Sequence, residues 1–416
     1  MKSSENVSSI RGLSPCHDRL QTDSEQLILS SGIYHYDPDL RHYRNPYFPH
    51  FSHIYVEKQA EQYDLTKRIL SRFPDANIIL TDHYKDIFNR SRQNISEQYK
   101  SRKLILAVKN GQRIYKGAPL CQDFGNEHFY YSSCMMNCVF DCEYCYLKGM
   151  YPSADIVIFV NTDDYFHDVD LLLDKHPVYL CISYDTDLAA ADYFTGYLDL
   201  WRKYSAEKPD LTIELRTKSA GKMIWRNCRN SIHMAENPEN DDAGIRSVTY
   251  MSAETAYDCR PGVHKSDNMI YAFTLSPQSV IDKYEHRTPS LKARLLCAAE
   301  GLEKGFRIRL CFDPVMYIPD WKAEYSKMME LTSCMLDMER ITDYSIGAFR
   351  IPKDYLKNMR KQMPYSSAAW YPYTLEEGIY RYDHDLETDM QDTLTGLIKK
   401  KVPGASVIRD DSQQKI

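Results

Sequence analysis

The segment HFYYSSCMMNCVFDCEYCYLK, residues 128–148, joins a strand-like run to four closely spaced cysteines. These are Cys134, Cys138, Cys142 and Cys145. Because the apolar run 128–134 comes first, the cysteines are expected in the loop at the carboxyl end of a strand. In barrels built from alternating strands and helices, that end carries the active site. The segment therefore predicts both a fold class and the position of a site.

Apolar runs of strand length recur along the chain and are mostly separated by helical patterns. The runs are 53–58, 76–82, 103–110, 128–134, 155–161, 177–184, 211–218, 269–276, 306–314 and 344–350. The helical patterns are 60–73, 193–207, 291–305, 321–340 and 386–402. β-Branched runs that alternate with helices predict an α/β fold with a parallel sheet covered by helices. The number of repeats suits a complete or partial (β/α) barrel.

The same pattern divides the chain into four expected parts. Residues 1–50 form a polar, partly flexible segment, and 51–125 form a small N-terminal α/β unit. Residues 126–355 form the barrel, with an irregular polar insertion near 226–268. Residues 356–416 hold an aromatic segment and a closing helix.

Composition excludes several classes of protein. The 416 residues carry a formal net charge of −6. No apolar run approaches the roughly 18 residues that would span a membrane, and the first residues lack the apolar core of a signal peptide. A cytoplasmic protein without a membrane partner is expected. A broad basic surface for nucleic acid is not favoured, although a local groove is compatible with this charge.

Cysteines in a chain without a secretion signal point to metal binding or catalysis rather than disulfides. Thiolates select zinc or iron–sulfur clusters. Structural zinc sites normally draw two ligand pairs from separate turns, whereas here one segment holds all four cysteines. A zinc-stabilised binding module without enzymatic activity is nevertheless one alternative for this segment.

The triple Cys138-x3-Cys142-x2-Cys145 resembles the signature of the radical S-adenosylmethionine (SAM) superfamily. That resemblance implies a partial (β/α)6-type barrel with a small N-terminal extension. It implies that the three thiolates hold a [4Fe-4S] cluster, whose open iron binds SAM, and that a 5′-deoxyadenosyl radical abstracts hydrogen from a substrate. An electron donor such as flavodoxin or ferredoxin is then an expected partner. Cys134 is an extra cysteine in this comparison.

The ending C-E-Y-C-Y-L at 142–147 resembles the spore photoproduct lyase family, which reverts a thymine–thymine photoadduct in DNA. Similar stretches occur in order at 54–70, 156–166, 273–295, 305–317 and 403–407. The resemblance implies that Tyr144 and Tyr146 lie near SAM and take part in hydrogen-atom transfer. It also implies SAM contacts for Lys218, Thr274, Thr186 and Asp187. From the residues alone, Asp187 is equally suited to cap a helix.

The chain departs from the family at the thiol that supplies hydrogen to the product radical. Tyr184 stands where that cysteine is expected, and Cys181 lies three residues earlier. On a regular strand these two side chains face opposite sides, unless a bulge intervenes. Both residues are therefore candidates for the hydrogen donor.

The stretch 371–382 corresponds to a hairpin that wedges the DNA duplex in the family. It keeps its aromatic residues, which stack on unpaired bases, but it carries Glu376 and Glu377. Carboxylates are unfavourable beside phosphates. Repair of a thymine photoproduct in DNA is the leading hypothesis. A radical SAM enzyme that acts on another nucleotide, RNA or a peptide is the alternative.

Overall fold

The computed structural model describes residues 50–117, 121–225 and 268–410. The polar N-terminal segment, apart from its last residue, lies outside these ranges, and so does almost all of the predicted insertion. Within them, no helix combines the length and apolar character needed to cross a membrane.

The larger sheet has the strand order β18-β14-β13-β11-β10-β9-β5-β4. All neighbours are parallel except β4, which is antiparallel to β5. Its strands are β4 (Ile114–Lys116), β5 (Phe129–Ser132), β9 (Val178–Cys181), β10 (Leu211–Thr217), β11 (Met269–Thr274), β13 (Arg307–Val315), β14 (Asp343–Ala348) and β18 (Val407–Arg409).

The smaller sheet has the order β2-β1-β3-β8-β6, and its first four strands are parallel. They are β1 (His53–Glu57), β2 (Asn77–Thr81), β3 (Leu104–Ala107) and β8 (Ile156–Phe159), while β6 (Met135–Met136) runs antiparallel to β8. The chain passes from β5 in the larger sheet to β6 in the smaller one through Ser133 and Cys134. The chain therefore crosses from one sheet to the other at the first of the four cysteines.

Helices cover these sheets, as the sequence pattern predicts. Contacts join α6 to β9, α8 to β10, α10 to β13 and α13 to β14. The helices are α2 (Asp64–Ser71), α3 (Lys85–Phe88), α4 (Ile95–Gln98), α5 (Leu147–Met150), α6 (Thr162–Leu173), α7 (Leu188–Thr195), α8 (Tyr197–Ala206), α9 (Gln278–Tyr284), α10 (Leu291–Glu303), α11 (Trp321–Met335), α12 (Lys353–Gln362) and α13 (His384–Lys401).

The helix predicted over 193–207 is in fact the end of α7 followed by α8. Gly196 separates them with φ at 65°, a left-handed conformation in which glycine is favoured. A Cβ there would also lie 2.7 Å from an Arg68 guanidinium nitrogen. The helical periodicity continues across the break, which is why the sequence pattern does not show it.

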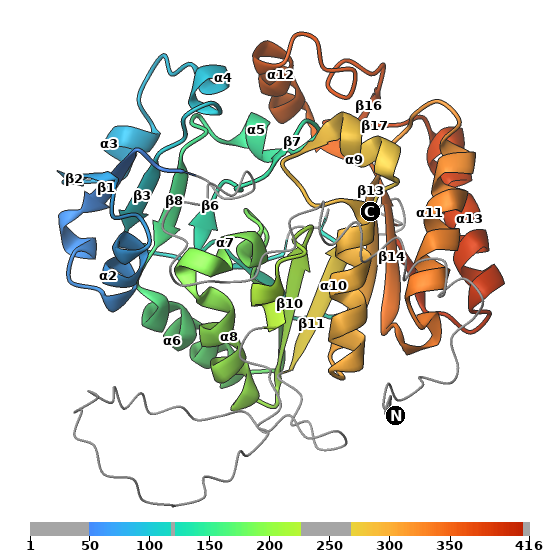
Figure 1. The fold of residues 1–416 in the computed structure, drawn as a ribbon, viewed down its shortest axis with the longest axis horizontal. Helices are drawn as coiled ribbons and strands as arrows, with labels where there is room; N and C mark the ends of the chain where they lie inside the picture. Colours follow the sequence, from blue (N-terminus) through green and yellow to red (C-terminus); the bar gives the residue numbers. More distant parts are fainter. Residues whose placement is uncertain (1–49, 118–120, 226–267, 411–416) are drawn as a thin grey trace, which may run out of the picture.

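Two small sheets complete the fold. β7 (Asp141–Cys142) pairs with β12 (Glu285–His286). β15 (Arg350–Pro352), β17 (Ile379–Arg381) and β16 (Thr374–Glu376) form a three-stranded sheet that contains the expected C-terminal hairpin. Figure 1 shows α12 beside this hairpin and close to α5. The α/β prediction is confirmed, and within the described ranges the strands form open sheets rather than one closed barrel.

Candidate active site

The predicted site residues gather at one edge of the larger sheet. β5, β9, β10 and β11 are neighbouring parallel strands, so their carboxyl ends share an edge. The cysteine segment follows β5, Thr186 and Asp187 follow β9, Lys218 follows β10, and Thr274 ends β11.

The three cysteines of the triple lie close together on a loop that is anchored to α9. Cys142 pairs through its backbone with Glu285 in β12, and the Glu143 amide donates to the Tyr284 carbonyl at 2.8 Å. The thiols of Cys138, Cys142 and Cys145 are free and interact electrostatically. In the part of the chain that the structure describes, no group of three or more His, Cys, Asp or Glu side chains is arranged as a formed metal site. Their role as ligands stays a prediction.

Cys134 is separate from this triple. It is buried in the main core, and its Sγ lies 4.0 Å from the Ile182 carbonyl oxygen. Burial raises the pKa of its thiol to about 12.

Cations surround the cysteine loop. The Arg102 guanidinium donates to the carbonyls of Cys138 and Phe140. The Lys148 ammonium pairs with Asp141 and lies 3.7 Å from the Tyr99 ring centroid. Burial raises the pKa of the Cys138 thiol to about 12, and Arg102 opposes that rise. This environment suits a buried centre of negative charge.

A buried ion pair lies behind the loop, and sequence reasoning missed it. Glu285 accepts hydrogen bonds from Tyr144 and from Ser276, and it pairs with Arg294. Burial alone would raise the pKa of Glu285, but Arg294 and Lys218 lower it to about 2. The pair fixes Tyr144 beside Cys142. The sequence did contain an indication of this ion pair, because both charged residues lie in the segment 273–295 that resembles the family.

Lys218 places a positive charge among the cysteines. Its ammonium lies 5.6 Å from the Tyr144 ring centroid and interacts with the thiols of Cys142 and Cys145. Burial disfavours the charged form, yet Glu285 raises the pKa of Lys218 above its ordinary value. Lys218 is therefore protonated at neutral pH and can hold a carboxylate.

Asp187 has the capping role that the sequence left open. Its side chain accepts from the Ala190 amide at 3.0 Å, from the Thr217 hydroxyl at 2.7 Å and from the Lys218 amide at 2.7 Å. It thus joins α7 to the end of β10. The neighbouring Thr186 hydroxyl is buried without a hydrogen-bond partner among the described residues, so it can accept a ligand contact.

Thr274 lies away from the thiols' immediate contacts. It is buried at the end of β11, and its carbonyl accepts from Arg294 at 3.0 Å. Through Arg294 it is linked to Glu285 and so to the cysteine loop.

Cys181 and Tyr184 occupy the same small cluster, contrary to the opposite faces expected from strand parity. Cys181 belongs to a cluster with Phe129 and Tyr179, and Tyr184 packs against this cluster. The parity argument does not apply, because β9 ends at Cys181 and Tyr184 lies in the turn that follows. The Tyr146 hydroxyl donates to the Tyr184 carbonyl at 2.6 Å, which connects this cluster to the cysteine loop.

Cys121 is a further thiol in this cluster, and it is not among the site residues predicted from the sequence. Its Sγ lies 3.2 Å from the Tyr184 hydroxyl. The two residues are 63 positions apart in the chain, so no local spacing could have revealed the contact.

A groove beside the hairpin combines cations with aromatic rings. Its cavity volume is about 450 Å³, and its lining residues are Lys353, Lys357, Arg360, Lys361, Trp370 and Tyr380. Trp370 is 54% exposed. The Arg360 guanidinium lies over both rings, at 5.3 Å and 5.4 Å from their centroids.

The groove is connected to the cysteine loop through α12 and α5. A Cβ at Gly149 would lie 2.2 Å from the Tyr355 carbonyl oxygen, so only glycine allows this close approach. Asn358 and Gln362 donate to the carbonyls of Gly149 and Lys148, at 2.9 Å and 2.7 Å. α12 therefore rests on the turn that follows the last cysteine of the triple.

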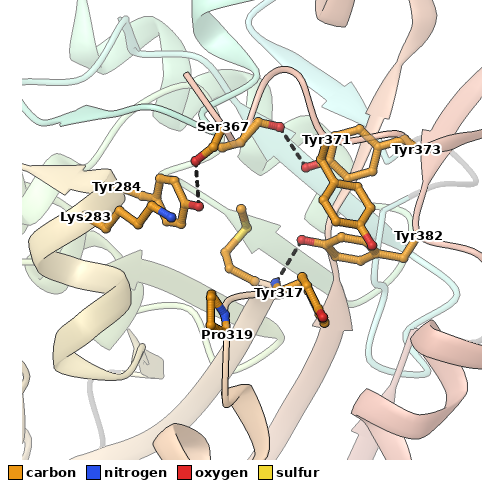
Figure 2. A pocket seen from close by; sticks show the side chains of 10 residues that line it. Lys283, Tyr284, Tyr317, Pro319, Ser367, Tyr371, Tyr373 and Tyr382 are labelled. Carbon is orange, nitrogen blue, oxygen red and sulfur yellow. Dashed lines mark hydrogen bonds between the residues drawn. The ribbon is translucent and has the colours of Figure 1, made fainter. Parts of the chain in front are cut away.

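A second pocket, of about 170 Å³, is rich in tyrosine. Figure 2 shows Tyr284 and Ser367 facing one another across a 2.9 Å hydrogen bond, with Tyr371, Tyr373 and Tyr382 grouped opposite them. The Tyr284 carbonyl accepts a hydrogen bond from the Glu143 amide, so this pocket also adjoins the cysteine loop.

Comparisons with known proteins confirm the resemblance that the motifs predict. No family model matches the chain. A curated spore photoproduct lyase from Clostridium acetobutylicum is 23% identical over 321 residues, which cover 76% of this chain and 83% of the relative.

Two solved structures share the fold. Spore photoproduct lyase complexed with dinucleoside spore photoproduct aligns with a TM-score of 0.67 and 17% identity, over 87% of this chain and 99% of that chain. A mutant of that enzyme with bound AdoMet (SAM) and dinucleoside spore photoproduct aligns with a TM-score of 0.66 and 18% identity, again over 87% and 99%.

Proposed function

We propose that this chain is a radical SAM enzyme that repairs a thymine photoproduct in DNA, as its relatives named spore photoproduct lyase do. The observation that carries the proposal is the grouping of Cys138, Cys142 and Cys145 with the Lys218 ammonium at the carboxyl edge of the larger sheet. In this proposal the larger sheet and its helices serve as the partial (β/α)6 barrel.

The donor set fits the expected cofactors. Three thiols on one loop match a [4Fe-4S] cluster that keeps one iron open. The unpartnered Thr186 hydroxyl and the Lys218 ammonium offer polar contacts for SAM. Together, bound cluster and SAM supply one-electron cleavage of SAM and with it a radical that abstracts hydrogen.

The chain's own residues orient and shield this chemistry. Asp187 fixes the backbone of Lys218, and Glu285 fixes the Tyr144 ring beneath the ammonium. Cys142 belongs to the apolar core, and Cys138 and Cys145 are partly buried against it. Water is thereby kept from the region where a reactive radical would otherwise be quenched.

A nucleic-acid substrate is supported by the groove between α12 and the hairpin. Its cations suit phosphates, and its exposed Trp370 suits stacking on a base. Glu376 and Glu377 do not line the groove, so the carboxylates in the hairpin do not oppose a phosphate backbone there. The tyrosine-rich pocket gives a second aromatic surface, next to the cysteine loop, for a base that has left the stack.

We expect the double variant Lys357→Ala/Lys361→Ala to weaken binding of a short duplex DNA about tenfold. Removing one cation that binds a phosphate lowers the slope of log affinity against log salt by about 0.9, so the slope falls by up to about 2. Arg360 is left in place because it also supports the hairpin, donating to the Ala369 carbonyl at 2.9 Å. Fluorescence anisotropy at several salt concentrations measures both quantities.

The matched control removes two exposed lysines from α13, in the variant Lys399→Ala/Lys400→Ala. It should leave affinity and salt slope unchanged. Equal losses in the two double variants would mean that DNA is attracted by overall charge and not by this groove.

The initiation chemistry is tested by reconstituting the cluster under anaerobic conditions and supplying SAM and a strong reductant. The expected result is release of 5′-deoxyadenosine, detected by mass spectrometry. A colourless protein that takes up stoichiometric zinc and releases no 5′-deoxyadenosine would support the zinc-stabilised module instead.

A further inference from the structure

A thiol and a phenol from separate parts of the chain are in contact beside the candidate active site. The Cys121 Sγ lies 3.2 Å from the Tyr184 hydroxyl, and the Tyr184 ring stacks on Tyr131 with centroids 4.2 Å apart. All three side chains are only partly buried, so a substrate can reach them. Burial raises the pKa of Tyr184, and the phenol therefore keeps its proton at neutral pH.

This pair is connected to the cysteine loop by a short path. Tyr146, which follows Cys145, donates to the Tyr184 carbonyl at 2.6 Å, and the two rings lie 6.2 Å apart. Cys121 and Tyr184 are thus close to the residues that would surround a bound cluster, although Cys121 comes from a different segment.

Cys181 lacks the corresponding contact. It packs in the same cluster, but among the described residues no hydrogen bond joins its Sγ to Tyr184. It is buried, with 6% of its surface exposed. The thiol placed to exchange hydrogen with Tyr184 is therefore that of Cys121.

We propose that Cys121 and Tyr184 together form the hydrogen-atom donor of the reaction. Tyr184 donates a hydrogen atom to the product radical, and Cys121 then donates one to the Tyr184 radical. The assignment rests on the proposed function. Where the family is expected to use one cysteine at the position of Tyr184, this chain would use two residues that the fold brings together.

The Tyr184 O–H bond breaks while a C–H bond forms on the carbon-centred radical of the product. The Cys121 S–H bond then breaks while the Tyr184 O–H bond forms again, which leaves a sulfur radical. One proton and one electron, the latter from the low-potential electron-transfer protein that also serves the cluster, restore the Cys121 thiol.

The test compares wild type with Cys121→Ala, Cys121→Ser, Tyr184→Phe and Cys181→Ala in anaerobic turnover of dinucleoside spore photoproduct. The hydroxyl of Cys121→Ser keeps a hydrogen bond to Tyr184 but has an O–H bond too strong to donate hydrogen. Both Cys121 variants are expected to release 5′-deoxyadenosine, form at most about one product per enzyme and then stop. They should accumulate a tyrosyl signal in electron paramagnetic resonance spectra.

Tyr184→Phe is expected to form less product already in the first turnover. This decrease in product formation should be larger than the decrease in Cys181→Ala. In D2O the wild type should place deuterium in the product, because both donor hydrogens exchange with solvent. Sustained turnover by both Cys121 variants, or a stall in Cys181→Ala instead, would overturn the assignment. A wild type that releases no 5′-deoxyadenosine would instead overturn the proposed function, and the assignment with it.

The pairing itself is tested without cofactors. In the protein as purified, Tyr184→Ala should raise the rate of Cys121 alkylation by iodoacetamide about tenfold, because Tyr184 covers the thiol. The rate at Cys334, on α11, should not change. An unchanged rate at Cys121 would contradict the approach of the two side chains on which the pair depends.

Discussion

Replacing Cys142 with alanine is expected to abolish iron binding and all release of 5′-deoxyadenosine. Cys142 is the central cysteine of the triple, and its backbone is held against Glu285 in β12. Two remaining thiols cannot hold a cluster that needs three. The loss of the cluster is measured by iron and acid-labile sulfide analysis and by the cluster's absorption at about 400 nm.

Cys134→Ala is the matched control, since it removes a buried thiol from the same segment. The Cys134 Sγ lies 4.0 Å from the Ile182 carbonyl oxygen, and Cys134 is not part of the Cys138-x3-Cys142-x2-Cys145 triple. This variant should keep the iron content and the SAM cleavage of the wild type. Full cluster content and cleavage in Cys142→Ala would refute the ligand assignment, and loss of metal in both variants would point to a four-cysteine site.

Arg294→Ala is expected to lower the free energy of unfolding by about 3–5 kcal/mol, the usual cost of removing one partner from a buried ion pair. Both Arg294 and Glu285 have fully buried side chains. Arg294 also donates to Thr288 at 2.8 Å and to the carbonyls of Thr274 and Pro289 at 3.0 Å. Its loss leaves the Glu285 charge poorly compensated and these acceptors without a donor.

Urea unfolding of the purified protein measures this difference. Lys292→Ala, on the same helix but partly exposed, should change stability by less than about 0.5 kcal/mol. A cost below about 1 kcal/mol for Arg294→Ala, well under the usual range for a buried ion pair, would mean that the charge of Glu285 is not held by Arg294. The account of how Tyr144 is fixed would then be wrong.

Much of the fold could be predicted from local patterns. The runs at 155–161 and 269–276 form β8 and β11, because strands buried on both faces are continuously apolar. The run at 211–218, in which apolar and polar residues mostly alternate, forms β10. These patterns do not show which strands are neighbours in a sheet. β8 joins β3 in the smaller sheet, so residues on both sides of the expected boundary at 125 share one sheet. Pairing depends on contacts between distant residues, which the composition of one strand does not specify.

The site could be predicted where its residues are consecutive, and it was missed where distant segments meet. Cys138, Cys142 and Cys145 are found by spacing alone. The contact between Cys121 and Tyr184 joins residues that are 63 positions apart in the chain. The expected separation of Cys181 from Tyr184 was wrong, because parity applies only while the strand continues.

The measurement that tests the central claim most directly is an anaerobic repair assay. Cluster-reconstituted protein, SAM and reductant are incubated with DNA that carries the spore photoproduct, and recovered thymine is measured by mass spectrometry. We predict that thymine is recovered together with release of 5′-deoxyadenosine. Release of 5′-deoxyadenosine without thymine would contradict the DNA substrate and indicate a radical enzyme that acts on a different molecule.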